Sequence, residues 1–200
     1  MFDSFGLNIR ADGYVLCESK FYQALDILNL ENTCSLVKGV NYLEGEIDSG
    51  IWAVSYLISM YAHKPESFTL FSCSVNNNEL SLEELSHISC YMDNIYPLFD
   101  TDTTVYDMVC CGIKSNDLSI EADQVRELFM IDKERFNRPL SGVGNEVFKA
   151  MAAIGYCYNK KVFCFPWLSK KRFEGFHKHL TWLLDKLAEL DMMVIVPIGR

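Results

Sequence analysis

The chain has 200 residues, of which 50% are apolar and 22% are charged, a composition typical of an ordinary globular domain. Eighteen basic and 27 acidic residues give a net charge of −9, which repels phosphate backbones and argues against nucleic acid as a partner. No apolar run is long enough to span a bilayer, and the acidic start at Asp3 does not resemble a signal peptide, so we expect a cytoplasmic protein.

The first part of the chain is typical of short strands and turns. Strand-like residues on either side of a turn at 11–13 predict a β-hairpin. Residues 39–43 predict a short apolar strand, and the spacing of apolar residues over 52–61 predicts a mostly buried helix. A loop that contains Gly45 and Gly50 joins this strand to this helix.

The rest of the chain alternates between the two kinds of element. Strands are predicted at 68–73, 88–92, 162–165 and 193–196, and helices from Ser81 and over 120–129, 145–155 and 173–190. The late strands are uniformly apolar, which is typical of strands buried on both faces. We therefore predict an α/β fold with a mostly parallel sheet covered by helices on both sides.

The loop between residues 43 and 52 has the frame of a phosphate-binding loop. Gly45 and Gly50 lie five residues apart between a strand and a helix, with Ser49 just before the second glycine. Glycines let backbone N–H groups converge on an anion at the positive end of the following helix. Two glycines at this spacing are also compatible with a plain turn.

The residues around these glycines do not suit a polyphosphate. A working loop continues with a lysine, which binds the β- and γ-phosphates, and a hydroxyl, which binds Mg²⁺. Here the corresponding places hold Ile51, Trp52 and Ala53, and the loop itself carries Glu46 and Asp48. Carboxylates at this place repel phosphate, so the sequence favours a loop without catalytic function.

The segment from Ser81 to Gly112 resembles the ATP-binding cassette (ABC) ATPases around their glutamine loop. Pro97-Leu98-Phe99 and Thr104-Val105 match the family pattern, and Asp93 occupies the place of the glutamine. The likeness covers roughly residues 35–200 and rests on the order and spacing of the motifs.

A second motif of this resemblance precedes the helix predicted at 145–155. Leu140, Ser141, Gly142 and Gly144 resemble the family signature LSGGQ. In the family, the serine and the glycine amide contact a nucleotide that the partner's loop holds. The structural alternative for Ser141 is a helix cap.

The remaining family motifs are absent. The strand at 162–165 corresponds to the Walker B strand, but it continues into Phe165-Pro166-Trp167 and not into the family's acid pair. The last strand is followed by Pro197-Ile198-Gly199-Arg200, without the switch histidine. We therefore assign no catalytic residues and expect no ordinary ATPase activity.

The resemblance implies one P-loop NTPase-like domain, with an N-terminal antiparallel β part at 1–38 and a region with the glutamine-loop and signature motifs at 81–145. It implies a binding, assembly or regulatory subunit that pairs with itself or with an ABC ATPase, and a membrane permease as a further partner. The protein would then lie in the cytoplasm or at the inner face of the membrane. ATP and Mg²⁺ would bind only if a partner supplies the site. The alternatives are a divergent active ATPase that energises transport and a nucleotide-independent scaffold.

Three other features have simple interpretations. The eight cysteines form no CxxC pair, so we expect them to be reduced and mostly buried. His177 and His179 do not supply the ligand cluster that a metal needs, so no metal is predicted. The basic cluster from Lys170 to Arg172 lies at a helix start, where it is solvated or touches an acidic partner.

Overall fold

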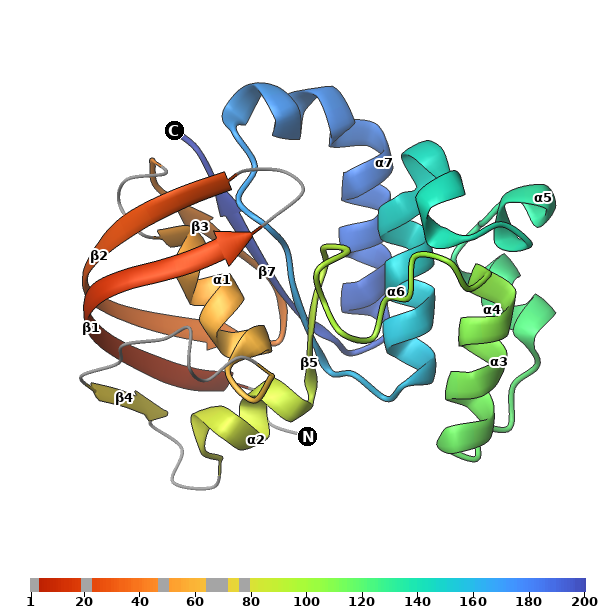
Figure 1. Ribbon diagram of the computed structural model, residues 1–200, viewed down its shortest axis with the longest axis horizontal. Coiled ribbons are helices and arrows are strands. Elements are labelled where there is room, and N and C mark those ends of the chain that lie inside the picture. Colours follow the sequence, from red (N-terminus) through yellow and green to blue (C-terminus); the bar gives the residue numbers. More distant parts are fainter. Residues whose placement is uncertain (1–3, 19–22, 47–50, 64–71, 76–79) are drawn as a thin grey trace.

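The computed structural model describes residues 4–18, 23–46, 51–63, 72–75 and 80–200 of the chain. In chain order the elements are β1 (Ser4–Glu18), β2 (Gln23–Val37), β3 (Gly39–Glu44), α1 (Ile51–Met60), β4 (Ser72–Val75), α2 (Leu82–His87), β5 (Ser89–Tyr91), α3 (Val105–Ser115), α4 (Ala122–Leu128), α5 (Lys133–Phe136), η3 (Leu140–Gly142), η4 (Gly144–Glu146), α6 (Val147–Cys157), β6 (Val162–Cys164), α7 (Lys170–Glu189) and β7 (Met193–Ile198). The strands form an antiparallel sheet of order β2-β1-β4 and a parallel sheet of order β3-β7-β6-β5 (Figure 1).

The antiparallel sheet is built on one long strand pair. β1 and β2 pair from Ser4↔Val37 to Glu18↔Gln23, so the turn predicted at 11–13 is wrong. Asp12 and Gly13 lie inside β1, because a continuous ladder with β2 outweighs the local turn preference of an Asp-Gly pair. β4 pairs with β1 on its other side. Most of the strand predicted at 68–73 lies outside the described residues.

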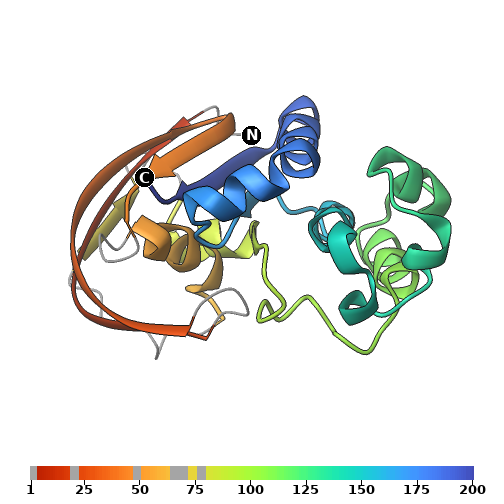
Figure 2. The ribbon, with the colours of Figure 1, turned by 90° about the horizontal axis from the view of Figure 1, so that it is seen from above.

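The parallel sheet confirms the predicted α/β architecture. All its neighbouring strands run parallel, and its central side chains, such as those of Cys90, Phe163 and Val194, are fully buried. Helix α1 packs against β5, β6 and β7, whereas α7 packs against β3 and β7. Figures 1 and 2 show α1 and α7 on opposite sides of this sheet. Burial on both sides explains why the strands are apolar throughout.

Helices α3–α5 form a separate group at the end of the molecule remote from β1–β3 (Figure 2). The sequence analysis did not predict α3, although Thr104 caps it by accepting a hydrogen bond from the Asp107 amide, 3.1 Å away. A threonine followed three residues later by an aspartate is a recognisable helix start. Helix α3 packs against α6, and Gly155 of α6 lies against Phe163 and Cys90 of the parallel sheet, so α6 connects this group to the sheet.

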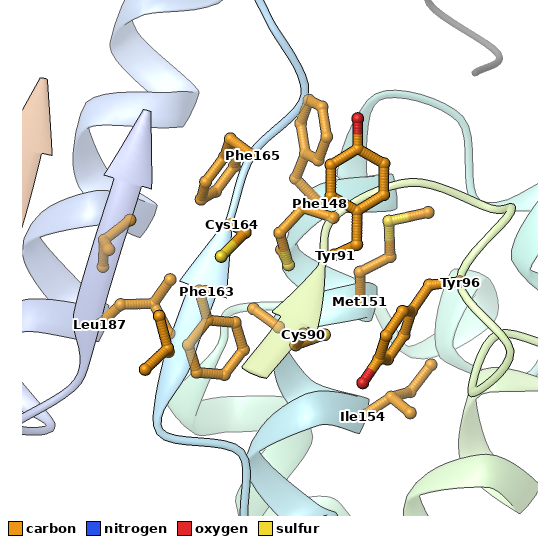
Figure 3. Close-up of a cluster of buried hydrophobic side chains, with 14 of the residues drawn as sticks. Cys90, Tyr91, Tyr96, Phe148, Met151, Ile154, Phe163, Cys164, Phe165 and Leu187 are labelled. Atoms are coloured by element: carbon orange, nitrogen blue, oxygen red, sulfur yellow. The ribbon is translucent and has the colours of Figure 1, made fainter. Parts of the chain in front are cut away.

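Helix α6 packs closely on β5 and β6 (Figure 3). The rings of Phe148 on α6 and Phe165 after β6 lie 5.4 Å apart. An added Cβ at Gly155 would lie 2.9 Å from the ring of Phe163 and 3.1 Å from the sulfur of Cys90. The glycine is therefore required for the close approach of helix and sheet.

Candidate functional site

Gly45, the first predicted residue of the phosphate-loop frame, lies at the carboxyl edge, by which we mean the edge of the parallel sheet where its strands end. β3 ends at Glu44, β7 ends at Ile198 and β6 ends at Cys164. Ligands of open parallel sheets bind at this edge, since loops from neighbouring strands meet there. Of the predicted loop residues, Gly45 is described, whereas Ser49 and Gly50 lie outside the described residues.

Gly45 is buried and uses both of its backbone polar groups within the protein. Its N–H donates to the carbonyl of Ile198 at 2.9 Å, which extends the ladder between β3 and β7. Its carbonyl accepts a hydrogen bond from Nε1 of Trp167 at 3.1 Å. The Gly45 amide is therefore committed to the sheet and does not point toward an anion.

Trp167 joins the ends of three strands. It follows β6, where the resemblance predicts the family's acid pair, and its indole donates to the carbonyl of Gly45 just after β3. The same ring lies against the residue after β7, since an added Cβ at Gly199 would be 2.9 Å from its Cζ2 atom. The adjacent Leu168 forms a parallel bridge with Ile198. The half-buried indole thus fills the space between the segments that follow β3, β6 and β7.

Sequence reasoning did not single out Trp167 as a functional residue. The available signal was the large aromatic residue at the place where the resemblance requires a carboxylate.

Asp93, at the glutamine-loop position, is completely buried just after β5. Its Oδ1 accepts a hydrogen bond from the amide of Ile95 at 3.3 Å. Its backbone N–H donates to the carbonyl of Tyr91, and its carbonyl accepts from the amide of Tyr96. These bonds make Asp93 a turn-forming residue at the end of the strand.

The signature-like segment, by which we mean residues 140–144, is exposed over most of its length. Leu140 is buried and anchors a single 3₁₀ turn, whereas Ser141 and Gly142 face the solvent. Gly144 is exposed and has φ of +67°, a conformation that favours glycine. The cap of α6 is Glu146, so the interpretation of Ser141 as a helix cap is wrong.

The Ser141 hydroxyl and the Gly142 amide are the two polar groups expected to face a nucleotide, and they differ in their capacity to form a further hydrogen bond. The Ser141 hydroxyl donates to the carbonyl of Thr101 at 3.2 Å and keeps its capacity to accept. The amide of Gly142 donates to the carbonyl of Pro139 at 2.7 Å and is therefore used inside the turn.

Contacts on both sides hold this segment in place. Thr104 and Pro139 form a bridge, and the amide of Val105 donates to the carbonyl of Arg138 at 3.0 Å. The Arg135 guanidinium donates to the side chain of Asn145. The segment is therefore a fixed surface feature that lies between α5 and α6.

The buried cysteines Cys90, Cys157 and Cys164 do not provide a second candidate site. Cys90 and Cys164 are free and fully buried, and burial raises the pKa of Cys90 to about 12. Burial also raises the pKa of Cys157 to about 12. A thiol with such a pKa is a poor nucleophile near neutral pH, because the reactive form is the thiolate. No group of three or more His, Cys, Asp or Glu side chains that could bind a metal occurs among the described residues.

The comparisons with known proteins yield only structural relatives. No family model and no curated protein matches the sequence. Among solved structures, a protein described as an ABC transporter ATP-binding protein from Pyrococcus furiosus is 13% identical, with 98% of this chain and 92% of that chain covered and a TM-score of 0.61. The fold is that of ABC transporter ATP-binding domains.

Two further structures agree. The ATP-binding subunit of an ABC transporter is 11% identical, with 98% of this chain and 79% of that chain covered and a TM-score of 0.60. The ATP-binding cassette MJ0796, a dimer in a post-hydrolysis state with ADP and phosphate, is 11% identical, with 98% and 88% covered and a TM-score of 0.57. At such low identity the likeness establishes an ABC ATPase-like fold. None of the described helices is long and apolar enough to cross a membrane.

Proposed function

We propose that this chain is a non-hydrolysing ABC ATPase-like domain that acts as a binding or assembly subunit, paired with itself or with an ABC ATPase. The observation that carries the proposal is the hydrogen bond from the Trp167 indole to the Gly45 carbonyl. This contact joins the segments that follow β3 and β6, where the resemblance predicts the phosphate loop and the acid pair.

The residues at this edge do not fit a magnesium-nucleotide. The places of the lysine and the magnesium-binding hydroxyl hold apolar side chains, from Ile51 to Ala53, and Glu46 adds a carboxylate beside the loop. A lost charge-assisted hydrogen bond removes about 1.5–3 kcal/mol of binding, which is one to two decades of affinity. The described part of the edge therefore supports neither phosphate binding nor a catalytic step.

The signature-like segment supports the pairing part of the proposal. Ser141 and Gly142 are exposed and fixed, and among the described residues one hydrogen bond holds the Ser141 side chain, the bond to the carbonyl of Thr101. One structural neighbour is an ABC cassette in a dimeric state. In a pair with an ABC ATPase, the Ser141 hydroxyl would contact a nucleotide that the partner's loop holds. A permease partner and a location at the inner face of the membrane belong to the same proposal.

The test measures pairing and phosphate release together. The tagged chain is purified from its own cells, co-purifying ABC-type subunits are identified by mass spectrometry, and phosphate release is measured for the chain alone and for the pair. We expect release only from a pair with an ABC ATPase, because a self-paired form has the same altered loop in both copies. Ser141→Ala should weaken that activity, whereas Ser119→Ala, a change at an exposed serine of the same helical region, should not.

Two results would contradict the proposal. Phosphate release that co-elutes with the isolated chain would favour an active ATPase. Recovery of neither a self-paired form nor an ABC-type partner would favour a nucleotide-independent scaffold.

A further inference from the structure

A pocket of about 360 Å³ opens at the carboxyl edge beside the start of α7. It is lined by Glu44 from β3, by Ile198 to Arg200 at the end of β7, and by Lys170, Phe173 and Glu174 from the first turns of α7. Figure 1 shows the ends of β3 and β7 and the start of α7 at the same end of the molecule. Its volume lies in the lower part of the range of small-molecule sites, about 300–1,000 Å³.

This pocket lies on the α7 side of the sheet, away from the phosphate-loop frame. Tyr42 packs its ring on Phe173 of α7, with the ring centroids 6.0 Å apart. Glu44 is two residues further along β3, so its side chain projects to the same side of the sheet. The loop that begins at Gly45 leads to α1 on the opposite side (Figure 2). The pocket therefore lies on the face of the sheet that α7 covers, and α1 covers the other face.

The pocket is lined by both acidic and basic side chains that do not pair with one another. Glu44 and Glu174 are acidic and Lys170 and Arg200 are basic, yet no ion pair joins any of these four side chains to another described residue. All four are exposed. Opposite charges that line one pocket without pairing leave room for a molecule that carries both charges.

We infer that this pocket binds a small zwitterion, namely a free amino acid. Lys170 and Arg200 bind its carboxylate, and the positive end of α7 adds to this attraction. Glu44 and Glu174 bind its ammonium group. The partly buried Phe173 contacts its side chain. This inference does not depend on the proposed pairing or on the absence of hydrolysis.

The test is calorimetric titration of the purified chain with each of the standard L-amino acids at millimolar concentration, with acetate and methylammonium as single-charge probes. We expect saturable binding of at least one amino acid, tighter than that of either probe. Lys170→Gln and Glu44→Gln should each weaken this binding roughly tenfold, as expected for a lost charge-assisted hydrogen bond. Lys171→Gln, at an exposed neighbour that does not line the pocket, should leave it unchanged.

Three results would overturn the inference. These are no saturable binding of any amino acid, binding of acetate as tight as that of the amino acids, and binding that Lys170→Gln leaves unaltered. Sedimentation velocity of the same variants provides a fourth contradicting result. If the variants shift a monomer–dimer equilibrium and no amino acid binds, the pocket is an interface between two copies. ATP binding by the chain would refute the proposed function and leave this inference standing.

Discussion

The carboxyl edge and the signature-like segment are the two regions where the resemblance predicts nucleotide contacts, and the rest of the chain treats them differently. At the carboxyl edge, Gly45 and Gly199 are buried and Trp167 packs against both. In the signature-like segment, Ser141 and Gly142 are exposed. At the carboxyl edge the chain therefore packs against itself, whereas the signature-like segment remains on the surface. The first should respond to mutation through stability, and the second through contacts with a partner.

The largest expected effect comes from removing the indole at the carboxyl edge. Trp167→Ala removes a half-buried ring and the hydrogen bond to Gly45, so we expect the free energy of unfolding to fall by about 2–3 kcal/mol. Urea denaturation followed by circular dichroism measures this loss. Trp167→Phe keeps most of the packing and should lose only about 1 kcal/mol. Equal losses in both variants would show that the ring packing does not matter.

A pair of glycine substitutions compares the two regions directly. An added Cβ at Gly199 would meet the Trp167 ring at 2.9 Å and the backbone of Ser169 at 3.4 Å, so Gly199→Ala should cost about 1–3 kcal/mol. At Gly142 the nearest atom is the Arg138 Cβ at 3.5 Å, an ordinary contact, so Gly142→Ala should change stability by less than about 0.5 kcal/mol. Thermal unfolding of both variants tests this, and similar losses would remove the distinction between the regions.

A serine comparison extends the same contrast to hydroxyl groups. Ser86 is buried, and its Oγ accepts from the amide of Ala62 and donates to the carbonyl of Ser59, both at 3.0 Å. Ser86→Ala leaves these backbone groups without their partner and should cost about 1–2 kcal/mol. Ser141→Ala removes one exposed bond and should cost less than about 0.5 kcal/mol in the isolated chain. A larger loss at Ser141 in chemical denaturation would mean that its hydroxyl is structural.

The smallest effect concerns how stability depends on pH at His63, which follows α1. Burial, Lys160 and His87 lower the pKa of His63, whose ring lies 5.3 Å from that of Tyr96. A lowered pKa means that the unfolded chain binds the proton more readily, so protonation destabilises the fold as the pH falls below about 6.5. His63→Gln should therefore make the melting temperature less dependent on pH between about 7 and 5. An unchanged slope would show that His63 does not contribute.

Local patterns predicted most of the parallel sheet and its covering helices, because buried strands and amphipathic helices leave clear periodicities. They failed for β1, where a local Asp-Gly turn signal lost to pairing with β2. The contact between Gly45 and Trp167 joins residues 122 positions apart, and neither residue type predicts it alone. The exposure of Ser141 also depends on packing between distant segments, so the sequence allowed the helix-cap interpretation.

Nucleotide binding by the isolated chain tests the central claim most directly. Equilibrium dialysis with labelled ATP and Mg²⁺ should show no saturable binding up to about 1 mM if the proposed function is right. The reasons are that residues 51–53 are apolar where a working loop needs a lysine and a hydroxyl, and that the Trp167 indole is bonded to the Gly45 carbonyl. Stoichiometric binding with a dissociation constant in the micromolar range would contradict the account.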